Sequence, residues 1–188
     1  MEFIKGRILE VDFYFNILLI GSSNTGKTNL ISRIYYYNDF LEHINIQKDR
    51  ISSPGFEFTS LAIKYKEKIN FIQFLDLPGN NILETLASPF MRGDCAFLLC
   101  YDAYNKDSFN YIKNKFFEIK NNYNNINAVY FLIRNKYDLK INKDNKNIIS
   151  DEEAFEFADK NNISFAHVSS IEKYETGIIQ LLELIVDK

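Results

Sequence analysis

Apolar residues gather in short runs along the chain, each about as long as a buried β-strand. The runs that suit strands of a parallel sheet covered on both faces are 15–20, 96–101, 128–133 and 163–168. Two further β-rich runs, 56–65 and 69–76, are joined by a short charged connection at 66–68 and predict a hairpin. These patterns together predict six strands.

Between the strands the apolar positions change to a helical spacing. The residues that share one face of the helix predicted after the run at 96–101 are Phe109, Ile112, Phe116 and Ile119. Asp107 or Ser108 is expected to cap the start of this helix. Ser150 and Glu153 form a capping box before another helix, and a last helix is predicted around 178–185.

Strand, helix, hairpin and then repeated strand–helix units predict one α/β domain. It should span residues 13–188, after a short N-terminal extension at 1–12. Its six-stranded sheet should be mostly parallel, with one antiparallel edge strand and helices on both faces. In such folds ligands bind beyond the carboxyl ends of the strands, so we expect the functional residues to gather there.

Composition narrows the classes of partner. The chain has 188 residues, of which 46% are apolar, and this is enough for one domain with a substantial core. Its net charge of −3 gives no reason to expect nucleic acid as a partner. Cys95 and Cys100 lie five positions apart in one predicted strand, so we expect two buried thiols on opposite faces. His43 and His167 do not have zinc-ligand spacing to these cysteines.

The ends of the chain bear on where the protein is found. No apolar stretch reaches the length of a membrane span, and the start lacks a signal-peptide pattern. Glu2 excludes N-myristoylation by the usual rule, and no prenylation cysteine precedes Lys188. We expect a cytoplasmic monomer, which is peripheral on endomembranes only if a lipidated C-terminus is missing from this chain.

The segment from Gly21 to Thr28 matches G-x-x-x-x-G-K-[ST] between a predicted strand and a predicted helix. Such a loop points backbone N–H groups at phosphate oxygens, and the helix N-terminus adds partial positive charge. Lys27 should reach the β- and γ-phosphates, Thr28 should ligate Mg²⁺, and Asn24 suits a left-handed backbone. A glycine-rich turn that only joins a strand to a helix is the alternative. The residues expected to line this phosphate site are Ser23, Asn24, Thr25, Gly26, Lys27, Thr28 and Asn29.

A second motif, D-x-x-G, begins at Asp76, at the end of a predicted strand. A carboxylate in this position can hold Mg²⁺, often through water, opposite the hydroxyl of the first loop. Gly79 can offer its backbone N–H to the γ-phosphate. The motif alone is equally compatible with a turn that ends a strand.

A third motif, N-K-x-D, follows the run at 128–133. The carboxylate of Asp138 can accept two hydrogen bonds from the N1–H and 2-amino group of guanine, a pattern that adenine cannot supply. Asn135 can tie this motif to the phosphate loop, and the stem of Lys136 can lie over the base. After the next strand, the loop at 169–171 can offer N–H groups to the guanine oxygen. Its residues are Ser169, Ser170 and Ile171.

At this point the chain resembles the Ras superfamily of small GTPases from about Phe13 onward, and within it the Rab branch. The segment 54–58 resembles the Rab sequence I-G-V-E-F, and 90–93 resembles Y-Y-R-G. The resemblance implies a P-loop NTPase fold that binds Mg²⁺ with GTP or GDP and hydrolyses GTP. It also implies effectors, exchange factors and activating proteins that bind through two switch regions, near 50–58 and 79–91, and a role in vesicle transport.

Departures from the family pattern affect the switch and the catalytic position. Ser53 stands where the family has a Mg²⁺-binding threonine, and Phe40 resembles the aromatic residue that packs against guanine, although a plain core contact is its alternative. Asn80 replaces the glutamine that orients the attacking water beside Lys27 and Gly79. Its shorter side chain predicts hydrolysis slowed by roughly a hundredfold. Two rival functions are a non-hydrolysing GTP/GDP-binding module that recruits partners constitutively, and a P-loop kinase or ATPase that accepts adenine.

Overall fold

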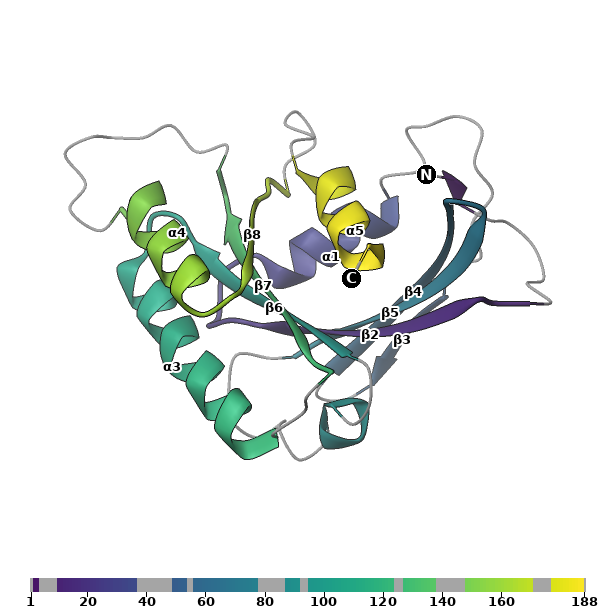
Figure 1. Ribbon diagram of the computed structural model, residues 1–188, viewed down its shortest axis with the longest axis horizontal. Helices are drawn as coiled ribbons and strands as arrows, with labels where there is room; N and C mark the ends of the chain where they lie inside the picture. The colour runs from purple at the N-terminus through teal and green to yellow at the C-terminus, as the bar shows by residue number, and fades with distance from the viewer. Residues whose placement is uncertain are drawn as a thin grey trace.

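A mixed β-sheet organises the chain in the computed structural model (Figure 1). The structure describes residues 2–3, 10–36, 49–53, 56–77, 87–91, 95–123, 127–137, 148–170 and 177–187. The six main strands, in spatial order, are β4 (Phe56–Tyr65), β5 (Lys68–Asp76), β2 (Phe13–Ile20), β6 (Cys95–Asp102), β7 (Val129–Asn135) and β8 (Ser164–His167). The five from β5 to β8 are parallel, and β4 runs antiparallel to β5. This confirms the predicted fold class.

The antiparallel strand is not a bare edge, which differs from the sequence expectation. Two short strands, β1 (Glu2–Phe3) and β3 (Asp49–Ser53), pair antiparallel with the outer side of β4. β1 pairs with residues 63–64 of β4, and β3 pairs with residues 56–60. Residues 2 and 3, which the sequence assigned to an N-terminal extension, are therefore joined to the sheet by backbone hydrogen bonds.

The hairpin between β4 and β5 closes through a two-residue turn. Lys66 and Glu67 both have positive φ, 47° and 61°, as in the type I′ turns that match the twist of a hairpin. Tyr65 pairs with Lys68, so the second strand begins one residue earlier than the sequence pattern predicts. Glycine or asparagine usually fills such positions, and this is why the pattern of charged residues did not identify the turn type.

Helices cover both faces of the sheet and divide the core in two (Figure 1). α1 (Lys27–Tyr36) and α5 (Ile178–Val186) pack on one face, and α3 (Lys106–Tyr123) and α4 (Asp151–Lys160) pack on the other. A short 3₁₀ turn, η3 (Ser88–Met91), precedes β6. Cys100 belongs to the first core and Cys95 to the second, which confirms two buried free thiols on opposite faces. Among the described helices, none has the length and apolar character needed to cross a membrane.

Capping side chains fix where the helices on the second face begin. The capping box before α4 is confirmed in part, because the Ser150 hydroxyl accepts a hydrogen bond from the Glu153 N–H at 3.1 Å. For α3 the predicted cap is wrong. Asn105 takes that role, since its Oδ1 accepts from the N–H groups of Asp107 and Ser108 at 3.0 and 3.2 Å. The Ser108 hydroxyl instead accepts from the Asp102 N–H at 3.0 Å and so ties the helix to the end of β6.

We expect Gly177→Ala to destabilise the protein by about 2–4 kcal/mol. Gly177 caps α5 with φ of 90°, and a Cβ added there would lie 1.9 Å from the carbonyl oxygen of His167. The backbone of the β8 strand or the start of α5 would have to shift. Urea unfolding followed by circular dichroism measures the change. Gln180→Ala, at an exposed position of the same helix, is the control, and a Gly177→Ala protein as stable as this control would contradict the prediction.

Candidate nucleotide-binding site

The loop at 21–26 curls between the end of β2 and the start of α1, as the sequence motif requires. Asn24 has φ of 65°, which confirms the expected left-handed backbone, and Gly26 has φ of 87°. The Thr25 hydroxyl is buried and donates to the Ser22 carbonyl at 2.9 Å, which closes the turn. The exposed residues of this segment are Ser23, Asn24, Thr28 and Asn29. A loop of this shape, followed by a helix N-terminus, is suited to bind phosphate through backbone N–H groups.

Lys27 places its ammonium group inside this loop. Nζ donates to the carbonyls of Gly21 at 2.8 Å and of Ser22 at 3.2 Å, and the residue is only 7% exposed. Burial lowers the pKa of Lys27, and the nearby Asp76 carboxylate acts in the opposite direction. The side chain is thus held ready at the loop, where a phosphate group could replace weak carbonyl contacts by charged ones.

Two of the three residues expected to hold a metal ion lie in direct contact. The Thr28 hydroxyl donates a hydrogen bond to Oδ2 of Asp76, which is the last residue of β5. Asp76 pairs with Leu19 across the parallel ladder, so the sheet itself sets this carboxylate beside the phosphate loop. A hydroxyl and a carboxylate are the hard oxygen donors that Mg²⁺ prefers. Ser53, the third expected ligand, ends β3; the structure describes its backbone and not its side chain.

Asn135 joins the phosphate loop to the base motif, as predicted. It is fully buried at the end of β7, and its Nδ2 donates to the Thr25 carbonyl at 2.8 Å. Its Oδ1 accepts from the Lys136 N–H at 2.9 Å and from the Ser170 hydroxyl at 3.2 Å. One amide therefore connects three loops. A Cβ on Gly26 would lie 2.4 Å from Nδ2, so glycine is needed there for both its φ and the close approach.

Lys136 has a partner that the sequence reasoning missed. Its Nζ forms an ion pair with Oδ2 of Asp102 at 2.6 Å, and Asp102 is the last residue of β6. The neighbouring strands β6 and β7 place Asp102 directly opposite Asn135, which brings the pair together. The only sequence signal was a carboxylate at the end of a predicted strand. This contact holds the lysine stem at the carboxyl edge of the sheet, where the sequence predicts the base.

The structure brings much of the predicted site to one edge of the sheet. The phosphate loop, Asp76, Asn135, Lys136, Ser169 and Ser170 all follow or end parallel strands. Five predicted positions lie outside the described residues and stay predictions: Phe40, Gly79, Asn80, Asp138 and Ile171.

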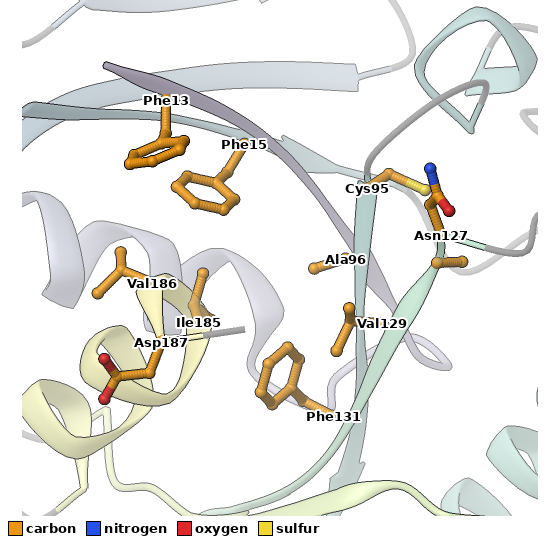
Figure 2. A pocket seen from close by; sticks show the side chains of 11 residues that line it. Phe13, Phe15, Cys95, Ala96, Asn127, Val129, Phe131, Ile185, Val186 and Asp187 are labelled. Carbon is orange, nitrogen blue, oxygen red and sulfur yellow. The ribbon is translucent and has the colours of Figure 1, made fainter. Parts of the chain in front are cut away.

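A pocket of about 630 Å³ lies elsewhere in the molecule (Figure 2). Phe13 and Phe15 at the start of β2, Ala96 at the start of β6 and Ile185 of α5 are among the side chains that line it. These are the amino-terminal ends of the strands, opposite to the edge that carries the phosphate loop. The cavity is therefore separate from the candidate site.

Comparison with known proteins supports the same assignment. The model of the Ras family matches residues 16–188. The chain is 31% identical to the GTP-binding protein YPT1 of Saccharomyces cerevisiae over 166 residues, which cover 87% of this chain and 73% of that protein. It is 29% identical over 179 residues to the Ras-related protein Rab-1 of Theileria parva, with 93% and 76% covered. A family match over this length, on a chain that carries the phosphate loop and the first two residues of the base motif, Asn135 and Lys136, on one sheet edge, shows that the protein belongs to the Ras family of small GTPases.

Proposed function

We propose that the protein is a switch that binds Mg²⁺ with GTP or GDP and hydrolyses GTP, with a Rab-like role in vesicle trafficking. The observation that carries this is the Asn135 amide, which donates to Thr25 in the phosphate loop and accepts from Ser170 in the predicted guanine loop. A single purine nucleotide can therefore reach both loops. Asp138 would read the guanine edge, and the N–H groups of Ser169, Ser170 and Ile171 would meet its oxygen.

The proposed metal site consists of Thr28, Ser53 and Asp76. The contact between the Thr28 hydroxyl and the Asp76 carboxylate fits this role, since a divalent cation near both could accept the hydroxyl oxygen and the carboxylate as ligands. Mg²⁺, when bound, neutralises charge on the β- and γ-phosphates. Lys27 would balance the same phosphates from the loop, and Gly79 would donate its N–H to the γ-phosphate.

The test of this function is the nucleotide bound to the protein as purified, followed by a competition assay. We expect to recover guanine nucleotide from the denatured protein. We also expect GTP, but not ATP, to displace fluorescent GDP. Displacement by ATP at similar concentrations would instead favour a P-loop kinase or ATPase. Removal of Mg²⁺ with a chelator should speed nucleotide release.

We expect Asn80→Gln to raise the single-turnover rate of GTP hydrolysis by about ten- to a hundredfold. The longer amide can reach the position from which it orients the attacking water, and orientation is most of what this residue supplies. The rate is measured with protein preloaded with GTP, and Asn161→Gln, at the end of α4, is the matched control. If Asn80→Gln hydrolyses GTP no faster than the wild type, the amide at position 80 does not limit the rate. If neither protein hydrolyses GTP measurably, the protein is better described as a non-hydrolysing GTP/GDP-binding module.

The proposed partners are effectors, exchange factors and activating proteins that contact the switch regions at 50–58 and 79–91. Phe58 of β4 packs against Phe90 of η3, with ring centroids 5.2 Å apart, so the two regions meet through an aromatic contact. Phe58 and Phe90 are both partly exposed. Through this contact, a change of conformation in one switch region could alter the binding of a partner at the other. Within this proposal the protein acts as a cytoplasmic monomer, which is peripheral on endomembranes only if a lipidated C-terminus is missing from this chain.

A further inference from the structure

Three polar side chains lie next to one another on adjacent strands, in a row at the position directly before the base motif. Tyr101 of β6 pairs in register with Arg134 of β7, and Arg134 pairs with His167 of β8. Tyr101 belongs to the core beneath α3 and α4, and the strand register gives Arg134 and His167 the same face. Arg134 is 3% exposed and Tyr101 is fully buried. A cation this deep in a core is rare unless it is paired.

Arg134 has one ionic partner in the described part of the chain. Its Nη1 contacts Oδ1 of Asp151, the first residue of α4. In the same row, three buried polar atoms lack hydrogen-bond partners among the residues described: Nε of Arg134, the hydroxyl of Tyr101 and Nδ1 of His167. Networks that are only partly satisfied are sensitive to small changes of charge, because no second contact replaces the one that is lost. The ion pair with Asp151 is therefore the main contact that holds the Arg134 guanidinium in place.

These three side chains support the base loop, which is the loop that begins at Asn135. The Tyr137 ring lies over the Arg134 guanidinium, with 5.5 Å from Cζ to the ring centroid, and its centroid is 4.9 Å from that of His167. The Tyr137 N–H donates to the Val168 carbonyl at 3.4 Å, and the Val168 N–H donates to the Arg134 carbonyl at 2.9 Å. The residue directly before Asp138 thus rests on Arg134 and His167, and α4 lies next to β8 (Figure 1).

We propose that Arg134 is a positioning residue for guanine-nucleotide binding, which holds the base loop on the first turn of α4 through Asp151 and Tyr137, and that protonation of His167 weakens this hold. The inference rests on the proposed function, because it concerns the affinity of that same site. It predicts that nucleotide release depends on residues that do not touch the nucleotide, and that release is faster in acid.

The direction of the pH effect follows from the groups around His167. Arg134 faces it from β7, and the Asp151 carboxylate faces it from α4, 4.0 Å from Nδ1. Tyr137 and Phe165 pack on its ring. Further along α4, Oε1 of Glu153 lies 3.9 Å from Nζ of Lys113 in α3. Burial, and then the charge of Arg134, lower the pKa of His167 below its ordinary value, so the ring is neutral near pH 7. Once protonated in acid, it would repel Arg134 and compete for Asp151.

The first test compares the dissociation rate of fluorescent GDP from the loaded full chain. Arg134→Met and Asp151→Asn should each speed dissociation by about tenfold near neutral pH. Asp151 is half exposed at a helix start, so its isosteric amide should fold normally. Glu156→Gln, an exposed residue of α4, is the matched control and should leave the rate unchanged. The single-turnover hydrolysis rate of protein that retains GTP should change by less than about twofold, because a positioning residue acts on the base end of the site.

The second test is the pH profile, which a purely structural role would not produce. Dissociation of GDP from the wild type should accelerate several-fold as the pH falls below about 6.5, and His167→Gln should flatten this dependence. In Arg134→Met the acid acceleration should also be reduced, since the group that the imidazolium repels is gone.

Distinct outcomes separate the inference from the proposed function. If wild-type protein does not retain guanine nucleotide, the proposed function fails. If it does, but Arg134→Met and Asp151→Asn release GDP at the control rate, the positioning role of Arg134 is wrong. An unchanged acid acceleration in His167→Gln would overturn the role of His167.

Discussion

Lys27→Met should lower the affinity for GDP and GTP by at least about a hundredfold. The ammonium group sits within the phosphate loop, 2.8 Å from the Gly21 carbonyl, and the substitution removes a charge that would contact the β- and γ-phosphates. Methionine has a similar shape, so the loss reflects charge rather than volume. Equilibrium titration with fluorescent GDP measures the effect.

The control for this variant is Lys160→Met, which changes the net charge equally at an exposed position of α4. Circular dichroism of both proteins checks that the fold is kept. If Lys27→Met binds GDP within about threefold of the control, the loop at 21–28 is not the phosphate site. The interpretation of the glycine-rich segment as a plain strand-to-helix connection would then be the better one.

Asp138→Asn should lower GTP affinity by about a thousandfold and remove most of the preference for GTP over ATP. The carboxylate can accept from both the N1–H and the 2-amino group of guanine, whereas an asparagine side chain would present its own N–H₂ group to one of these donors. Asp138 follows directly on residues 135–137, which the structure fixes beside Val168 and Ser170. Competition of GTP and ATP against fluorescent GDP gives both affinities.

Asp159→Asn, on the exposed side of α4, is the matched control for this substitution. A variant at Asp138 that still prefers GTP by the wild-type factor would show that another group reads the base. Comparison with Arg134→Met is informative, because loss of positioning should weaken both nucleotides, while loss of the carboxylate should act mainly on guanine.

Much of this molecule could be predicted because its signals are local. Short apolar runs bounded by polar loops gave the strands, and the capping box gave the start of α4 to the residue. The role of Asn135 could be predicted because the motif combines a fixed spacing with a fixed place after a strand. Asn24 and its left-handed backbone followed from the preference of asparagine for that conformation.

The features that escaped prediction depend on contacts between distant segments or on weak local signals. Lys136 and Asp102 are 34 positions apart, and only the parallel pairing of β6 and β7 brings them together. The row of Tyr101, Arg134 and His167 depends on strand register in the same way. The cap of α3 is a local error of two to three residues, because Asn105, Asp107 and Ser108 are all good capping residues and the sequence does not rank them.

The two short strands that pair with β4, β1 and β3, affect the tendency of the protein to aggregate at high concentration. An uncovered strand at the end of a sheet presents unpaired N–H and C=O groups to other chains, and this favours stacking into aggregates. Here two short segments occupy seven of the ten positions of β4 on that side, and the two positions between them, Leu61 and Ala62, carry fully buried side chains. A second molecule would first have to strip these segments away, so the sheet is protected against growth from this end.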